Sequence, residues 1–340
     1  MRTHALAVLC LAATAAAFAP PAGSLARRAA PRRAATALAA KAKKKADLFG
    51  GGKFIKAKTL GKYTANALSA PAAIVVARSG VVPRYWALVP PALKTALYVN
   101  SALALAATFV RQKALTFPDG LAHAWALGVL LLASPLGRDG YALVLAYFVA
   151  GTAVTRVGKA GKEAAGIAEG RGGSRGPENV WGSAGAGAAC ALALAVQPRV
   201  GFAARYVPAL RLAFVASFAT KLSDTFASEI GKAYGKTPFL ITTFKRVEPG
   251  TEGAVSLEGT AAGVAGSVLM AYAGVALGLC AGRNAVLACM GAAFVATNIE
   301  SVLGATVQGK FKVMTNEVVN AINTSIGAAL GFAASLYLGC

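Results

Sequence analysis

Long apolar segments separated by short polar stretches fill the chain from about residue 90 onward. Several approach the roughly 17–25 residues that a helix needs to cross a bilayer. The clearest cover Leu93–Val110, Leu121–Leu136, Tyr141–Val157, Val180–Val196, Tyr206–Thr220, Thr260–Ala281, Asn284–Leu303 and Val318–Leu338. A ninth and weaker segment, Tyr63–Ala77, fits a span or a helix on the membrane surface. The pattern predicts an all-α, polytopic integral membrane helix bundle with about seven to nine transmembrane helices and no large soluble domain.

The composition agrees with this membrane prediction. The 340 residues are 56% hydrophobic but only 14% charged, and the mean hydropathy is +0.57, whereas soluble proteins carry about 25% charged residues. Such hydrophobicity excludes intrinsic disorder for the bulk of the chain. The five cysteines have neither CxxC nor zinc-finger spacing, which excludes a disulfide scaffold and a cysteine-based metal site.

The net charge of +22 is concentrated at the N-terminus. Residues 1–62 hold 13 Lys/Arg and one acid, Asp47. Residues 1–17 have the basic start and short apolar core of a signal peptide, and residues 18–62 have the Ala- and Arg-rich, acid-poor composition of a transit peptide and basic linker. The Ala-Phe-Ala-Pro quartet at 17–20 resembles the bipartite presequence of proteins sent to complex plastids. The alternative is an ordinary secretory signal with a disordered basic tail; in both cases residues 63–340 form the multi-span domain.

Glycine and alanine are frequent inside the apolar segments. Small residues let helices approach closely in lipid, and Gly182/Ala186, Gly259/Gly263 and Gly274/Gly278 are spaced for such contacts. Pairs of this kind also arise by chance in a chain so rich in these residues.

Two polar loops combine glycines with cations. Residues 158–179 contain Lys159, Lys162, Arg171 and Arg175, and residues 232–254 contain Lys232, Lys236, Lys245 and Arg246. Exposed backbone N–H groups and cations suit phosphate oxygens, although neither loop has the P-loop pattern. The alternative is a plain connection. Because basic residues flank both loops, we expect them on one side of the membrane.

Acidic residues in or beside the apolar segments are candidates for function, because ionised groups in a bilayer cost a few kcal/mol. On a helix, Lys221, Asp224 and Ser228 share a face, and Glu229 points elsewhere unless Gly231 unwinds the helix end. The alternative for Lys221 and Asp224 is mutual neutralisation without further function.

Three further polar clusters follow along the chain. Glu252, Ser256 and Glu258 precede or begin one span, where a helix-capping role is the alternative to a functional one. Glu300 lies in the next span. Asn316, Asn320 and Asn323 form a stripe at i, i+4 and i+7, which suits either interhelical hydrogen bonds or the wall of a polar cavity. His123, in an apolar run beside Trp125, is expected to pack between helices or to lie at the membrane interface, and not to be a ligand.

These clusters together resemble the transmembrane protein 19 family. The resemblance is carried by Ser223-Asp-Thr-Phe-Ala-Ser-Glu-Ile-Gly231, Gly250-Thr-Glu-Gly-Ala-Val-Ser-Leu-Glu-Gly-Thr260, Asn298-Ile-Glu-Ser301 and Thr315-Asn-Glu317, and it runs from about Pro91 to the C-terminus. The plastid branch of the family is phytyl-phosphate kinase of tocopherol synthesis. The Asp…Glu-Gly-Thr pairing also looks like polyprenol and dolichol kinases, which use CTP. The loop Gly172–Gly176 departs from the family pattern, and only Arg175 carries over there.

The resemblance implies a membrane phosphotransferase that moves a phosphoryl group from a nucleotide, CTP, to phytyl phosphate. Asp224, Glu229 and Glu258 are the implied catalytic acids and Mg²⁺ ligands, with Lys221 as catalytic cation. Arg175, Lys245, Glu252, Asn316 and Asn320 are the implied nucleotide and head-group contacts. The implied partners are an isoprenoid phosphate, a nucleotide and membrane lipid, and the implied location is a plastid membrane.

Other classes of function remain to be weighed against a kinase. Intramembrane polar residues and glycine-broken helices also suit a transporter of a small anionic or lipid substrate. A non-catalytic scaffold would leave the acidic clusters unexplained. Binding of a nucleic acid polymer is disfavoured, because over half of the net charge of +22 lies in the removable N-terminal segment.

Overall fold

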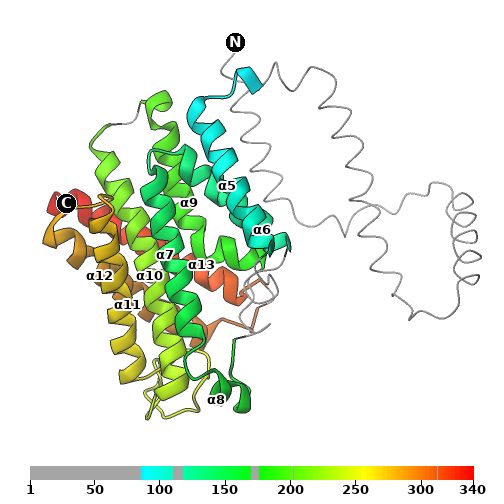
Figure 1. Cartoon of the computed structure of the whole chain (residues 1–340). Coiled ribbons are helices and arrows are strands. Elements are labelled where there is room, and N and C mark those ends of the chain that lie inside the picture. The colour runs from blue at the N-terminus through cyan, green and yellow to red at the C-terminus, as the bar shows by residue number, and fades with distance from the viewer. Residues whose placement is uncertain (1–85, 110–117, 170–175, 202, 312) are drawn as a thin grey trace, which may run out of the picture. The chain divides into compact units, whose positions relative to one another are not determined.

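Each of the eight apolar segments expected beyond residue 90 forms a helix in the computed structural model, which describes residues 86–109, 118–169, 176–201, 203–311 and 313–340. The long helices are α5 Pro91–Phe109, α6 Pro118–Ala133, α7 Gly137–Thr155, α9 Pro177–Val200, α10 Tyr206–Tyr234, α11 Leu257–Ala276, α12 Gly282–Thr306 and α13 Asn316–Leu338 (Figure 1). The proposed presequence and the segment Tyr63–Ala77 lie outside the described residues.

The helices form an all-α bundle with the length and composition of a membrane protein. Four of those described, α9, α11, α12 and α13, are long and apolar enough to cross a membrane. Helix α6 is also apolar, over Gly120–Ala133, but it is shorter. The expected helix bundle is therefore confirmed, while the number of spans stays a prediction.

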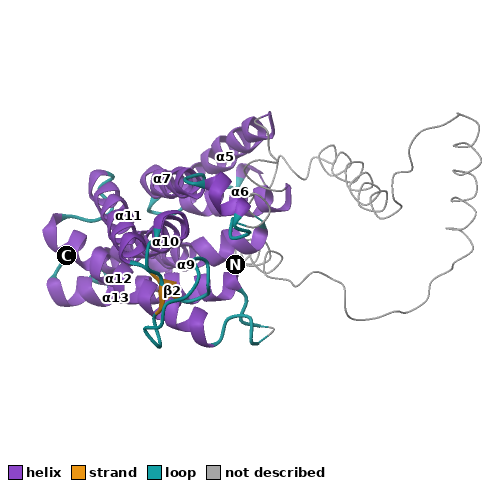
Figure 2. Cartoon of the chain, turned by 90° about the horizontal axis from the view of Figure 1, so that it is seen from below, coloured by secondary structure: helices purple, strands orange, loops and turns teal. Residues whose placement is uncertain are grey.

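Helix α10 lies at the centre of the bundle. It packs against α7, α9, α11, α12 and α13 (Figure 2), and every residue from Leu212 to Ser223 is buried. A helix that is buried all round in this way belongs to the core. Polar groups on α10 are therefore surrounded by protein.

Helix α10 is longer than its apolar segment predicts. The apolar run ends at Thr220, but the helix continues to Tyr234 and ends at Gly235, without unwinding at Gly231. The difference has a physical reason, because Lys221, Asp224 and Glu229 lower the local hydropathy while ion pairs inside the bundle keep them in the helix.

Glycines on α11 allow a close approach to α10. A Cβ atom at Gly259 would lie 2.7 Å from the carbonyl oxygen of Ala227, and one at Gly263 would lie 3.1 Å from that of Ser223. A Cβ atom at Gly182 on α9 would likewise lie 2.8 Å from the carbonyl oxygen of Glu317 at the start of α13. The small-residue spacing in the sequence thus marks real helix contacts in these two places.

The first three described helices are joined by a buried amide. Asn100 on α5 donates to the carbonyl oxygen of Trp125 at 2.5 Å and accepts from the hydroxyl of Tyr141 on α7 at 3.0 Å. His123 on α6 accepts from the indole N–H of Trp181 on α9 at 2.6 Å. The expectation that His123 packs between helices is confirmed.

Small elements interrupt the two long loops, and the sequence did not predict them. The short helix α8, Lys159–Ala164, follows α7, and the strands β1, Phe239–Leu240, and β2, Ala254–Val255, pair antiparallel between α10 and α11. The described parts of both loops lie at the same end of the bundle, the lower end in Figure 1, and their place on one side of the membrane stays a prediction.

Replacing Gly259 with alanine is expected to destabilise the protein by about 1–3 kcal/mol, because the new methyl group overpacks against the backbone of α10. Gly291 on α12 is the matched control, since a Cβ atom there meets nothing within 4 Å. Thermal unfolding of the two variants in detergent measures the difference. Equal melting temperatures for Gly259→Ala and Gly291→Ala would contradict the close α10–α11 contact.

Candidate functional site

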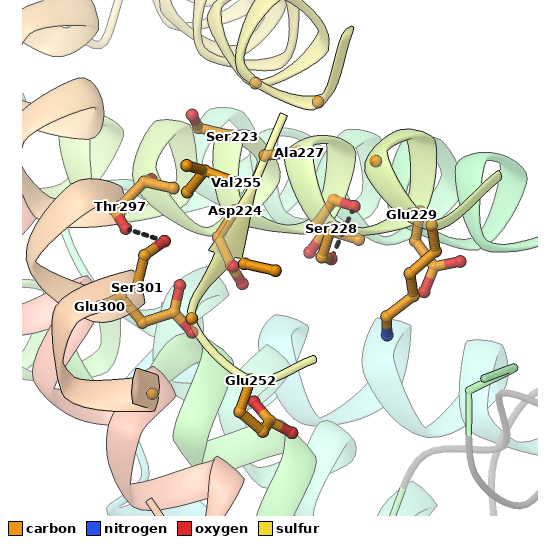
Figure 3. Close-up of a pocket in the computed structure, with 18 of the residues that line it drawn as sticks. Ser223, Asp224, Ala227, Ser228, Glu229, Glu252, Val255, Thr297, Glu300 and Ser301 are labelled. Atoms are coloured by element: carbon orange, nitrogen blue, oxygen red, sulfur yellow. Dashed lines mark hydrogen bonds between the residues drawn. The ribbon is translucent and has the colours of Figure 1, made fainter. Parts of the chain in front are cut away.

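A polar cavity of about 220 Å³ lies where the end of α10 meets the loops. Its walls come from α10, α11, α12, the start of α13, strand β2 and the loop that precedes β2 (Figure 3). Both polar loops singled out in the sequence contribute, through Glu169 and through Pro249–Ser256. The cavity therefore gathers segments that are far apart along the chain.

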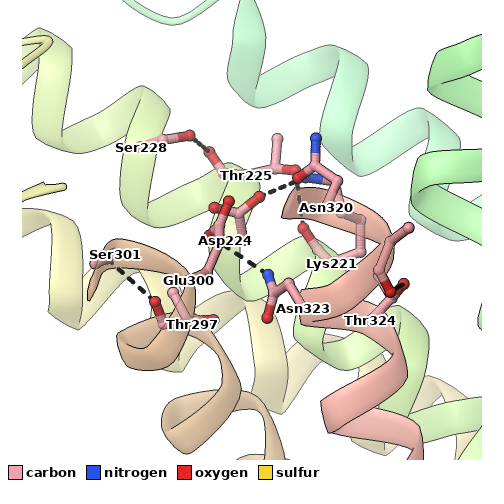
Figure 4. Close-up of polar contacts among 11 residues, drawn as sticks. Lys221, Asp224, Thr225, Ser228, Thr297, Glu300, Ser301, Asn320, Asn323 and Thr324 are labelled. Carbon is pink, nitrogen blue, oxygen red and sulfur yellow. Dashed lines mark hydrogen bonds and ion pairs between the residues drawn. The ribbon is translucent and has the colours of Figure 1, made fainter. Parts of the chain in front are cut away.

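Lys221 and Asp224 form an ion pair on the cavity wall. Their side chains are only 7% and 13% exposed, and the Lys221 ammonium also donates to Oδ1 of Asn320 on α13 at 2.5 Å (Figure 4). The shared face predicted for Lys221 and Asp224 is confirmed. Of the asparagine stripe, Asn316 and Asn320 line the cavity, while Asn320 and Asn323 form hydrogen bonds between helices.

Asp224 faces a second carboxyl group, that of Glu300 on α12. The two side chains lie against one another at hydrogen-bonding distance (Figure 4), and Nδ2 of Asn323 donates to Oε2 of Glu300 at 3.4 Å. Two carboxylates this close repel each other unless a proton or a cation stands between them. Lys221 and Lys232 supply positive charge beside the pair.

Glu229 points away from Asp224 and pairs with Lys162 of α8. This ion pair is deeply buried, with side chains 3% and 2% exposed, and Lys162 also donates to the carbonyl oxygen of Thr155 at 3.0 Å. Glu229 still lines the cavity. Its carboxylate attaches α8, and with it the glycine-rich loop, to α10.

The polar residues around the start of α11 differ in their surroundings. Ser256 caps the helix, because its hydroxyl accepts from the N–H of Gly259 at 3.1 Å, so the capping alternative is confirmed for this residue. Glu258, in the first turn, does not line the cavity, and its Oε2 is buried without a hydrogen-bond partner. Glu252 lines the cavity.

A close approach of the loop to α12 holds Glu252 at the cavity. Gly253 has a left-handed φ of 76°, and a Cβ atom there would lie 2.5 Å from the carbonyl oxygen of Ser301. Only glycine combines this backbone conformation with such a contact. The neighbouring Glu252 carboxylate is thereby brought within electrostatic range of Glu300.

The structure does not assemble the expected trio of Mg²⁺ ligands. Within the described part of the chain no three His, Cys, Asp or Glu side chains stand close enough to hold a metal, and Asp224, Glu229 and Glu258 point to different surroundings. The facing carboxyl groups of Asp224 and Glu300 nevertheless fit a hard cation, because Mg²⁺ is commonly bound by one or two carboxylates together with substrate phosphates.

The remaining expected contacts are scattered. Asn316 and Asn320 line the cavity, whereas Lys245 is exposed on the loop between the strands and does not. Arg175 lies outside the described residues. The structure therefore brings six of the expected residues to one cavity: Lys221, Asp224, Glu229, Glu252, Asn316 and Asn320.

Glu300 and Lys232 also line the cavity, and Lys162 contacts it through Glu229, although none of the three has a specific role in the sequence prediction. Glu300 carried a usable signal, since an acid inside an apolar segment is a functional candidate. Lys162 carried no such signal in the sequence, because its partner Glu229 is 67 residues away along the chain. Lys232 stood in a loop of several cations, and only the packing of α10 distinguishes it.

Comparisons with known proteins bear on the same part of the chain. The family model described as "Integral membrane protein DUF92" matches residues 100–328. An uncharacterized membrane protein of Synechocystis sp. is 55% identical over 236 residues, which are 69% of this chain and 88% of the relative. The residues matched by the family model include all the described residues that line the cavity.

Two other relatives are similar over shorter stretches. Protein VTE6, a chloroplastic protein of Arabidopsis thaliana, is 50% identical over 212 residues, which are 62% of each chain. An uncharacterized membrane protein of Methanocaldococcus jannaschii is 39% identical over 121 residues, 35% of this chain and 49% of the relative. No solved structure matches. The family resemblance drawn from the motifs is confirmed, and the chain belongs to the DUF92 family of integral membrane proteins.

Proposed function

We propose that the protein is a prenyl-phosphate kinase that transfers a phosphoryl group from a nucleotide, CTP, to phytyl phosphate and yields phytyl diphosphate. The observation that carries the proposal is the Asp224–Glu300 carboxyl pair beside Lys221, in a cavity formed by the helices of the bundle and the loops at one end of it. Support also comes from the resemblance of these motifs to the plastid branch of the family and from the similarity to a chloroplastic relative.

Phosphoryl transfer depends on positioning and charge neutralisation more than on covalent catalysis. An oxygen of the acceptor phosphate forms a bond to the γ-phosphorus of the nucleotide, and the bond from that phosphorus to the β-phosphate oxygen breaks. CDP leaves with the electron pair. Because the acceptor oxygen is already anionic, no strong base has to remove a proton from it.

Each charged group of the cavity has a place in this scheme. Asp224 and Glu300 would hold Mg²⁺, which supplies neutralisation of the phosphate oxygens when it is bound. The Lys221 ammonium, kept in place by Asn320, would contact the transferred phosphoryl group. Lys232, at the rim of the same cavity, would hold a neighbouring phosphate.

The remaining expected residues would contact the substrates and would not hold the metal or the transferred phosphoryl group, or they are assigned by the family resemblance alone. Asn316 and Glu252 line the cavity and would contact the nucleotide or the head group. Lys245 would have to reach the phosphates from its exposed loop. Glu258, half-buried in the first turn of α11, and Arg175, outside the described residues, stay predictions from the family resemblance.

A plastid membrane is the proposed location. The composition of residues 1–62 has the character of a plastid presequence, and the relatives include a chloroplastic protein and a membrane protein of Synechocystis sp.. A kinase built from membrane helices also suits an acceptor that is itself a lipid.

The proposed activity is tested with the purified chain in lipid nanodiscs, γ-labelled CTP, Mg²⁺ and phytyl phosphate. We expect label in phytyl diphosphate, and a fall in kcat of about 100-fold or more in both Asp224→Asn and Glu300→Gln, as for the loss of one preorganised charge contact. Glu248→Gln, at an exposed acid outside the cavity, is the matched control and should retain full activity.

Three outcomes would contradict the activity, the metal site or the choice of a kinase over a transporter. Wild-type protein that labels neither phytyl phosphate nor geranylgeranyl phosphate, with CTP, ATP or UTP as donor, would rule out the kinase. Near-normal turnover in both acid variants would leave a kinase but move its metal site elsewhere. Uptake of phytyl phosphate into vesicles without labelling would favour the transporter.

Variants of the Lys162–Glu229 pair test whether Glu229 is a structural partner of Lys162 or a metal ligand. Lys162→Met alone should lower the unfolding free energy by about 3–5 kcal/mol, because it leaves a buried carboxylate unpaired. The double variant Lys162→Met/Glu229→Gln should recover much of this loss in thermal unfolding. Its activity should keep the Mg²⁺ dependence of the wild type, and a strongly raised Mg²⁺ requirement would instead make Glu229 a metal ligand.

A further inference from the structure

The cavity extends along two helices toward the lipid-facing surface. Beyond the loop residues, its lining includes Thr260 and Val264 on α11 and Phe294 and Asn298 on α12. Val264 is 38% exposed and Phe294 is 49% exposed. Both helices are long and apolar enough to cross a membrane, so exposed apolar side chains along them face lipid.

The packing of α11 explains why an opening lies at this place. Gly259, Gly263 and Gly266 bring one face of α11 against the backbone of α10. Thr260 and Val264, four residues apart on one face of α11, line the cavity together with Phe294 and Asn298 of α12. Strand β2, through Val255, bounds the opening on the loop side.

We propose that the gap between α11 and α12 is a lateral entrance for a single-chain lipid phosphate. The phosphate head enters past Thr260 and Asn298 and reaches Asp224, Glu300 and Lys221, while the hydrocarbon chain stays in the bilayer beside Val264 and Phe294. This inference rests on the proposed function and names the route by which its acceptor arrives.

The character of the side chains along the gap matches such an amphiphile. The outer positions, Val264 and Phe294, are apolar, and the next ones, Thr260 and Asn298, are uncharged and polar. Behind them Thr297 has a buried hydroxyl without a hydrogen-bond partner, and the charged groups of Asp224 and Lys221 lie deepest. A water-soluble phosphate would need no apolar outer section.

The size of the cavity agrees with a chain that remains outside. Pockets that enclose a drug-sized ligand measure about 300–1,000 Å³, whereas this cavity measures about 220 Å³. It accommodates a phosphate head group and a cation but leaves no room for a long prenyl chain. The head group therefore has to be bound inside while the chain contacts lipid and the outer faces of α11 and α12.

A bulky residue in the gap tests the entrance. We expect Val264→Trp to raise KM for phytyl phosphate by about tenfold or more, because the indole fills the path of the chain, and to leave KM for a five-carbon, water-soluble prenyl phosphate unchanged. Leu269→Trp, at another exposed position of α11 outside the cavity, should change neither. Equal effects of Val264→Trp on both acceptors, or none, would overturn the inference.

A binding measurement separates this inference from the kinase itself. Phytyl phosphate with a diazirine in its chain is photolysed with the wild-type protein in nanodiscs, and the labelled peptides are mapped by mass spectrometry. Label concentrated on α11 and α12 and displaced by excess phytyl phosphate supports the entrance, even if no phosphoryl transfer is found. Label that is spread over all lipid-facing helices, or displaced equally by inorganic phosphate, would overturn it.

Discussion

The ion pair between Lys221 and Asp224 is the contact on which the rest of the structure depends. A charged group in the interior of a membrane bundle is costly unless another protein group compensates it. Here the compensation extends across three helices, because Lys221 also contacts Asn320 on α13 and Asp224 faces Glu300 on α12. The central position of α10, and the glycines that let α11 approach it, keep this network out of contact with lipid.

In the proposed function, the same network supplies the chemistry of the site. Two carboxyl groups in contact, with lysines beside them, form a place where a divalent cation and phosphate oxygens balance each other's charge. The neighbouring Lys162–Glu229 pair has all its charge satisfied within the protein and attaches the glycine-rich loop to α10. In the proposed function, the two buried ion pairs within one stretch of α10 have different roles, the first open to ligands and the second structural.

The sequence predicted the helices well because each depends on a local apolar run. It also predicted that Lys221 and Asp224 share a helix face, which follows from spacing within one helix. It did not predict which acids meet, because the contact of Asp224 with Glu300 and that of Glu229 with Lys162 depend on how separate helices pack. The short helix α8 and the two-residue strands are likewise held by packing and leave no periodic signal.

Binding of Mn²⁺, as a substitute for Mg²⁺ at oxygen ligands, tests the central claim most directly. Electron paramagnetic resonance of the purified protein should show one tightly held Mn²⁺ when CTP is present. The same signal should be absent in Asp224→Asn and in Glu300→Gln and should persist in the double variant that neutralises Lys162 and Glu229. Mn²⁺ held equally well in Asp224→Asn, or lost only when Glu229 is neutralised, would contradict the account.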